Sequence, residues 1–149
     1  MNKLKLALPL ALAAVLFSCD KDDDKPKTIK EKIIGKWGFQ SITSSKPITW
    51  EVGGEPTTDG FTHLATCVKD DYLVFKADNV LEENEGATKC DPQATQSTNT
   101  EWSIDGSNIE ISGETFKFIS VDGSTLKVSD VVDTEEQGEV TLTLVLKRK

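Results

Sequence analysis

The chain is poor in the side chains on which most enzymes and metal sites depend. Its 149 residues include one histidine, His63, and one arginine, Arg148. A lone histidine without a nucleophile in a recognisable motif supports no catalytic triad, and it gives a metal ion too few soft ligands. We therefore predict no catalytic residues, no metal site and no cofactor, and we expect a protein that is not an enzyme.

Positive charge and internal repetition are also scarce. The chain carries 17 basic and 25 acidic side chains, a formal net charge of −8. An acidic surface repels phosphate backbones, and no stripe of basic and aromatic residues relieves this repulsion, so we expect no nucleic-acid partner. No repeat of 20 to 50 residues is present. The chain beyond its N-terminal segment, roughly 120 residues, is long enough for one domain with one core, and we expect a monomer.

The one long apolar run lies at the N-terminus. Lys3 and Lys5 precede an apolar segment over residues 6–17, and the small residue Ser18 follows it. This order is typical of a secretory signal. A helix that spans a bilayer needs about 20 apolar residues, so the run is too short to favour a transmembrane helix.

Cys19 follows this run directly. Residues 16–19 read aliphatic, any residue, small residue, cysteine, which resembles the lipobox of bacterial lipoproteins. The resemblance implies that residues 1–18 are a signal peptide, cleaved before Cys19, and that Cys19 carries diacylglycerol on its sulfur and a further acyl chain, such as palmitate, on its amino group. Two or more acyl chains hold a protein stably at a membrane. A soluble signal peptide that happens to contain a cysteine is the alternative.

Residues 19–28 are predicted to be an acidic tether. Residues 20–27 consist of aspartate, lysine and one proline, a composition that cannot bury enough surface to fold. Without residues 1–18 the chain has 15 basic and 25 acidic side chains, a net charge of −10. A cysteine followed by a lysine and several aspartates resembles the lipoprotein export signal of Bacteroidetes, which implies an outer-membrane protein exposed at the cell surface. A plain spacer that faces the periplasm is the alternative.

Two cysteines remain once Cys19 is assigned to lipid. Cys67 and Cys90 lie in a chain that we expect to be exported, and exported compartments favour disulfides. We predict that they pair, which would restrict the unfolded chain by on the order of 3 kcal/mol. Two free buried thiols and a metal pair are the alternatives.

From residue 29 the pattern predicts one helical turn and then short strands. Thr28 and Glu31 form a possible capping box for a turn over residues 29–34, which Gly35 ends. Trp37, Phe39 and Ser41 then alternate with polar or small residues, as in a half-buried strand. Similar runs predict strands at residues 37–41, 72–76, 80–83, 98–104, 108–112, 115–121, 125–131 and 139–148, with residues 62–66 as a weaker candidate.

Turn signals separate most of these runs. Residues 77–79, 105–107 and 122–124 read Ala-Asp-Asn, Asp-Gly-Ser and Asp-Gly-Ser, which favour antiparallel hairpins. An antiparallel meander has two exposed edges, and closure into a barrel removes them. We therefore predict an all-β domain over residues 29–149, an up-and-down meander closed into a barrel of about eight strands.

The order of several short motifs resembles a known family. Gly35 and Trp37 match the Gly-x-Trp motif of lipocalins, and the segment 67–75, the second cysteine and residues 102–104 before an Asp-Gly turn follow in order. This order resembles the lipocalin-like domain of Bacteroidetes lipoproteins over about residues 32–149. The resemblance implies that Trp37 closes the barrel floor under a basic side chain of the last strand. Arg148 lies there; a solvated basic tail is the alternative.

Alternation also predicts which side chains point into the barrel. The inward set is Trp37, Phe39, Leu73, Phe75, Trp102, Ile104, Ile109, Ile111, Phe116, Phe118, Leu126, Val128, Leu142, Leu144 and Leu146. An eight-stranded barrel either fills itself or holds one small ligand. Our first hypothesis is a binding protein for a small hydrophobic or amphipathic ligand. The candidate ligand-lining residues are Phe39, Trp50, Phe75, Trp102, Phe116 and Phe118.

Two interpretations stay open at this stage. Trp50 lies in a long connection, where it is either a lid or a stacking platform for a sugar over the barrel mouth, or a side chain that staples the connection to the barrel. Asp70 and Asp71 are interpreted as solvation at a strand entry, because no pocket is visible from the sequence. The second hypothesis for function is a filled barrel that contacts a glycan or protein partner through its loops.

Overall fold

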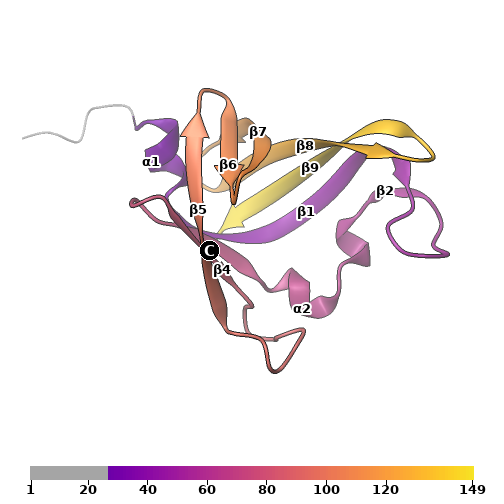
Figure 1. The fold of residues 1–149 in the computed structure, drawn as a ribbon, viewed down its shortest axis with the longest axis horizontal. Helices are drawn as coiled ribbons and strands as arrows, with labels where there is room; N and C mark the ends of the chain where they lie inside the picture. Colours follow the sequence, from indigo (N-terminus) through magenta and orange to yellow (C-terminus); the bar gives the residue numbers. More distant parts are fainter. Residues whose placement is uncertain (1–26) are drawn as a thin grey trace, which may run out of the picture.

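The computed structural model describes residues 27–149, and its first element is the capped helical turn predicted from the sequence (Figure 1). Helix α1 (Ile29–Ile33) follows Thr28, whose Oγ1 accepts from the Glu31 backbone N–H at 3.2 Å. The Glu31 carboxylate accepts from the Thr28 backbone N–H at 2.7 Å, which completes the capping box. The predicted signal peptide, Cys19 and the tether up to residue 26 lie outside the described residues.

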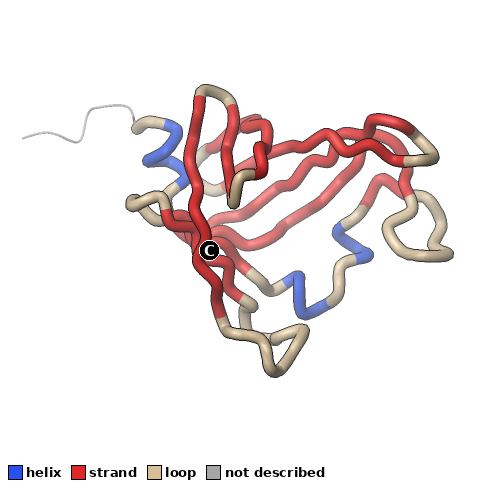
Figure 2. Tube along the Cα trace, viewed as in Figure 1, coloured by secondary structure: helices blue, strands red, loops and turns tan. Residues whose placement is uncertain are grey.

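Nine antiparallel strands form the body of the domain. Figure 2 shows that strands, in red, make up most of the described chain and are joined by loops. The strands are β1 (Gly35–Ile48), β2 (Thr57–Asp59), β3 (Tyr72–Phe75), β4 (Val80–Asn84), β5 (Ser97–Asp105), β6 (Asn108–Ile111), β7 (Glu114–Val121), β8 (Thr125–Thr134) and β9 (Gly138–Arg148). Each predicted strand from residue 72 onward is present, with bounds within three residues of those expected.

The sheet closes on itself because β1 pairs with both β3 and β9. Trp37 lies opposite Leu73 on one side and Arg148 on the other. Strands β1 and β3 to β9 therefore form a closed eight-stranded barrel, and β2 is an extra strand on the second half of β1. Closure leaves these eight strands without a long free edge, which confirms the predicted fold class.

A β-bulge changes which residues of β1 point inward. Phe39 pairs with Leu146, and the register then slips by one residue at Gln40. As a result Ile42, opposite the core residue Leu144, takes the inward place that simple alternation assigns to Ser41. The expectation that Ser41 shares the face of Trp37 is therefore wrong.

The core contains all of the predicted inward set except Leu142, together with residues that alternation alone does not identify. Ile33 of α1 is fully buried and covers one end of the barrel, and Leu81 of β4 is also buried. We call the end that α1 covers the closed end. The opposite end, which carries the β1–β3 and β4–β5 connections, we call the open end (Figure 1).

The segment between β2 and β3 is helical. The 3₁₀ helix η2 (Phe61–His63) and helix α2 (Thr66–Lys69) occupy the region where the sequence suggested a strand over residues 62–66, so that prediction is wrong. The Asp59 carboxylate accepts from the backbone N–H groups of Phe61 and Thr62, which favours a helical turn over an extended chain. Among residues 27–149, no helix is long and apolar enough to cross a bilayer.

Candidate binding site

The closed end is sealed by Arg148 and Trp37. The guanidinium carbon of Arg148 lies 4.2 Å from the centre of the Trp37 ring, the arrangement that the family resemblance implies. Its Nη1 donates to the Ile34 carbonyl at 3.0 Å and its Nη2 to the Lys32 carbonyl at 2.6 Å. Nε donates to the Gly123 carbonyl at 3.0 Å. One side chain therefore joins α1, the β7–β8 turn and β9.

Gly35 makes room for this arrangement. Its φ is +130°, and a Cβ at this position would overlap the Arg148 guanidinium. The adjacent Trp37 is fully buried, and its indole N–H donates to the Ile33 carbonyl at 2.6 Å. Ligand entry from this end would require α1 to leave the barrel.

The barrel interior is almost filled by side chains. An apolar cavity of about 50 Å³ remains, lined by Leu73, Phe75, Ile109, Ile111, Phe116, Leu126, Val128, Leu144 and Leu146. Pockets that bury a drug-sized ligand typically measure about 300–1,000 Å³. The interior as it stands therefore has no room for such a molecule.

Phe75 and Trp102 are core residues and not free walls of a pocket. Their rings meet edge to face with centroids 4.9 Å apart, and each residue is only 2% exposed. The Trp102 indole N–H donates to the Lys76 carbonyl at 3.1 Å. Phe116 lines the small internal cavity, and Phe118 packs against the same core.

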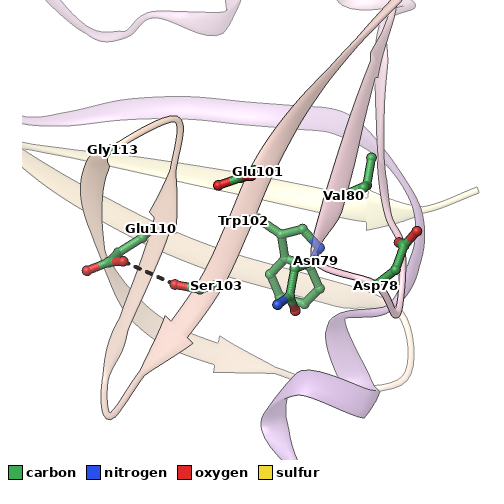
Figure 3. A pocket seen from close by; sticks show the side chains of 8 residues that line it. All are labelled: Asp78, Asn79, Val80, Glu101, Trp102, Ser103, Glu110 and Gly113. Atoms are coloured by element: carbon green, nitrogen blue, oxygen red, sulfur yellow. Dashed lines mark hydrogen bonds between the residues drawn. The ribbon is translucent and has the colours of Figure 1, made fainter.

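A hollow on the outer side of β5 lies beside the edge of Trp102 (Figure 3). It measures about 450 Å³ and is lined by Asp78, Asn79, Val80, Glu101, Trp102, Ser103, Glu110 and Gly113. The Ser103 hydroxyl donates to the Glu110 carboxylate at 3.1 Å, so part of its polar lining is already paired. Its mainly polar walls make it unsuitable for an apolar ligand.

A second pocket of about 240 Å³, which we call the mouth pocket, opens at the open end of the barrel. Its lining residues are Phe39, Asp71, Tyr72, Leu73, Glu83, Asn84, Glu85, Ala94, Thr95, Ser97 and Thr98. Phe39 and Leu73 also pack against the core, so they form an apolar floor. Leu73 lines the internal cavity as well, and it therefore separates the two spaces.

Strand register explains why acidic residues reach this pocket. Leu73 lies opposite Glu83, and Glu83 lies opposite Thr98, so these three side chains share the inward face of the sheet. Asp71, two residues before Leu73, continues that face just ahead of the first residue of β3. The pocket thus has an apolar floor and a polar rim.

One wall of the mouth pocket belongs to the connection over residues 85–96, which is tied to α2. Cys67 and Cys90 form a disulfide between these segments with a Cα–Cα distance of 5.2 Å, as the sequence predicts. The Asp70 carboxylate accepts from the backbone N–H groups of Ala87 and Thr88 at 2.7 and 2.9 Å. At Gly86, φ is +63° and a Cβ would be 2.5 Å from the Asp70 carbonyl oxygen, so this close approach requires glycine.

Asp71 has an unusual environment at the rim. Its Oδ1, like that of Asp70, is buried and has no hydrogen-bond partner in the described part of the chain. Burial raises the pKa of the Asp71 carboxyl, the charges of Glu85 and Asp70 raise it further, and Lys149 acts in the opposite direction. Lys149 donates its Nζ hydrogen bond to the Asp70 carbonyl at 2.9 Å.

Trp50 does not line the mouth pocket. Its indole N–H donates to the Thr57 carbonyl at 2.9 Å, and its ring lies where a Cβ of Gly60 would be. The side chain therefore staples the β1–β2 connection, which is the second of the two interpretations drawn from the sequence. His63 contacts Glu51 at 3.3 Å, and no cluster within residues 27–149 is arranged to hold a metal ion.

Of the aromatic residues proposed from the sequence to line a ligand site, the structure places Phe39 in the mouth pocket. Sequence reasoning missed Asp71, Glu83 and Glu85. Alternation from the buried Leu81 would have placed Glu83 on the inward face, because the two residues are separated by two positions on β4. Asp71 could not be assigned to the pocket in this way, because it lies outside β3 and its role depends on the path of the connections around it.

A match to a protein-family model agrees with this architecture. A family model described as "Lipocalin-like domain" matches residues 33–139. A structure of bovine odorant-binding protein with a selenium-containing odorant is 14% identical, covers 85% of this chain and 76% of its own, and has a TM-score of 0.42. A deswapped triple mutant of that bovine protein is 15% identical, with coverages of 79% and 74% and the same TM-score.

The search of curated proteins gave no significant match. The family match spans most of the described residues, from the end of α1 to the start of β9. On this match and the closed eight-stranded barrel, the chain belongs to the lipocalin-like domain family.

Proposed function

We propose that this chain is a lipid-anchored protein of the cell envelope that binds one small hydrophobic or amphipathic ligand at the open end of its barrel. The observation that carries the proposal is the mouth pocket, which combines an apolar floor of Phe39 and Leu73 with a polar rim. Small-molecule sites typically combine an apolar lining with a few placed polar groups.

The size of the pocket limits the ligand. At about 240 Å³ the mouth pocket suits a small molecule or the end of a longer one. The internal cavity of about 50 Å³ lies on the other side of Leu73. A ligand with a longer apolar tail would reach the internal cavity only if Leu73 moved.

Displacement of an environment-sensitive dye from the full-length chain tests the binding function. We expect apolar and amphipathic ligands to displace the dye, and Thr98→Trp to reduce dye binding because the larger side chain fills the mouth pocket. Thr115→Trp is the matched control, since Thr115 lies opposite Glu110 on the outer face. Equal binding by both variants would contradict a site at the mouth.

The lipid anchor is a separate part of the proposal and rests on residues 16–19. We expect Cys19→Ser to abolish incorporation of labelled palmitate and to move the protein out of the membrane fraction. Retention of both properties would contradict the anchor. Protease treatment of intact cells then distinguishes the two orientations: cleavage supports exposure at the cell surface, and protection, while a surface control is cut, supports the periplasmic side.

The nearly filled interior favours a second candidate function, an interaction module that contacts a glycan or protein through its loops. The polar hollow on β5 is a candidate surface for a glycan (Figure 3). Failure of every apolar ligand to bind, together with retention on a glycan array that Glu101→Gln weakens, would favour this function over the first.

A further inference from the structure

Four lysines lie on one part of the outer wall of the barrel, which we call the basic wall. They are Lys36 on β1, Lys117 on β7, Lys127 on β8 and Lys147 on β9. Each flanks core residues of its own strand, so alternation directs its side chain outward. Strands β7, β8, β9 and β1 are adjacent in the closed sheet, so the four side chains share one continuous surface.

Acidic side chains are separated from the basic wall along the barrel axis. The acidic residues of the same four strands all lie nearer the open end than the lysine of their strand; they are Glu114, Asp130, Asp133 and Glu139. Strand β1 contains no acidic residue. None of the four lysines forms an ion pair with a residue in the range 27–149.

The acidic residues at the border of the basic wall already have partners. The Asp122 carboxylate, in the β7–β8 turn, accepts from the backbone N–H groups of Ser124 and Thr125 at 2.7 Å each. Glu82 on the outer face of β4 pairs with Lys76 at 2.9 Å. The positive charge of the wall is therefore left for a partner outside the described chain.

The two ends of the barrel differ in charge as well. The connections at the open end, over residues 49–56, 60–71, 85–96 and 135–137, carry eight acidic side chains and two lysines. The segments at the closed end, over residues 27–34, 76–79, 106–107 and 122–124, carry three acidic side chains and four lysines. An anionic surface therefore attracts the basic wall and the closed end, and it repels the open end.

The tether joins the domain at the closed end. Lys27, the first described residue, comes directly before the cap of α1, which covers that end. Cys19 is eight residues earlier, so the two positions are at most roughly 29 Å apart. A tether of this length makes contact with the membrane intramolecular, and a weakly attractive surface is then sufficient. Residues 20–25 carry four aspartates and two lysines, so the attraction must come from the domain.

We propose that the basic wall and the closed end rest on the anionic headgroups of the membrane leaflet that holds the lipid on Cys19, with the mouth pocket directed toward the aqueous phase. This inference rests on the lipid anchor of the proposed function and adds an orientation to it. A ligand then enters the mouth pocket from the aqueous phase and not from the bilayer.

Lysine reactivity in vesicles tests the orientation. The full-length lipidated protein is reconstituted into vesicles of phosphatidylcholine alone and of phosphatidylcholine mixed with phosphatidylglycerol. A water-soluble acetylating reagent is added, and the rate at each lysine is measured by mass spectrometry. We expect Lys127 and Lys147 to react about threefold more slowly in the anionic vesicles, because headgroups cover them. Lys46 and Lys89, which lie at the open end, should react equally in both.

Salt and two variants locate the effect in the basic wall. High salt should remove the difference between the two vesicle types, because it screens exposed charges. Lys127→Gln with Lys147→Gln should remove the protection of the remaining wall residues, Lys36 and Lys117. Lys46→Gln with Lys89→Gln is the matched control, since it removes the same charge from the open end and should leave that protection unchanged.

The outcomes separate this inference from the anchor beneath it. Flotation of the protein with both vesicle types, together with equal reactivity of Lys127 and Lys147 in the two, overturns the orientation and leaves the anchor standing. Protection of Lys46 and Lys89 in place of the wall lysines also overturns the orientation. Failure to float with either vesicle type overturns the anchor, and the orientation falls with it.

Discussion

The two ends of the barrel differ in how completely their buried polar groups are hydrogen-bonded. At the closed end, every guanidinium nitrogen of Arg148 donates to a carbonyl, and the Trp37 indole donates to Ile33. At the open end, Asp70 and Asp71 each have a buried carboxylate oxygen that accepts no hydrogen bond from a described residue. Full pairing is what a stable fold requires. An unpaired, perturbed group in a pocket marks a candidate site of function.

The largest effect is expected at the closed end. Trp37 is 0% exposed and connects the core with α1 and Arg148. We expect Trp37→Ala to lower the free energy of unfolding by about 3–5 kcal/mol, measured by chemical denaturation. Trp50→Ala removes the same side chain from a half-buried position near the open end and should cost clearly less. Equal losses of unfolding free energy in the two variants would contradict the view that the closed end is the more important for stability.

The disulfide is the main covalent restraint of the open end. Cys67 and Cys90 are 23 residues apart, and we expect their joint replacement by serine to lower the free energy of unfolding by about 3 kcal/mol. The same change should weaken binding of the environment-sensitive dye, because the wall over residues 85–96 loses its tie to α2. Cys67→Ser with Cys90→Ser that leaves binding unaltered would show that the other contacts hold this wall.

Replacement of Arg148 should have the next largest effect on the unfolding free energy. Arg148→Lys keeps the charge and loses the fork of three hydrogen bonds to Ile34, Lys32 and Gly123. We expect a loss of about 2 kcal/mol in unfolding free energy. Lys147→Ala, an exposed neighbour on β9, should stay within about 0.5 kcal/mol of the parent chain. If Arg148→Lys left the unfolding free energy unchanged, the closed end would be held by apolar packing alone.

The smallest effects depend on pH and have opposite signs on the two faces of the sheet at the open end. The pKa of Asp71 is raised, chiefly by burial, so its contribution to stability is present at low pH and is lost as the pH rises through the folded-state pKa. We therefore expect Asp71→Asn to stabilise the protein at neutral pH by less than about 1 kcal/mol. The gain should vanish at a pH below the pKa of the unfolded state.

Glu82 is the matched control for this behaviour. Its hydrogen bonds with Lys76 and then Asn84 lower the pKa of its carboxyl, so its contribution is present at neutral pH and is lost as the pH falls through the folded-state pKa. Glu82→Gln should therefore destabilise the protein at neutral pH, by about 0.2–1 kcal/mol. Thermal denaturation of both variants over a pH series measures the two signs. The same sign in both would refute the assignment of Asp71.

Much of the barrel could be predicted because its signals are local. Asp-Gly turns and alternating apolar residues define the hairpins from residue 97 onward, and Arg148 is the single arginine available to cover Trp37. The slip at Gln40 could not be predicted, because a bulge depends on how β1 fits β9 and leaves no mark in the residue types. Ile42 therefore takes the inward place expected of Ser41.

The mouth pocket was harder to predict because it depends on contacts between distant segments. Asp70 and Asp71 look alike in sequence, yet Asp70 caps the backbone at Ala87 and Thr88, whereas Asp71 faces the pocket. The difference arises from the register of β3 and from the path of a connection almost 20 residues away, as the separation of 17 and 18 residues in those hydrogen bonds shows. The sequence prediction chose aromatic residues as ligand-lining, and most of these are packed in the core instead.

The seal at the closed end also sets the order in which the chain can complete its fold. The hydrogen bonds from Arg148 to Ile34 and Lys32 join residues 114 and 116 positions apart. Contacts of such long range form slowly, because loop closure must precede the gain in energy. The hairpins from β3 to β9 can form earlier, and β1 can pair with β3, but the barrel closes only when β1 also pairs with β9. During synthesis the barrel therefore cannot close until the last strand, β9, is free of the ribosome.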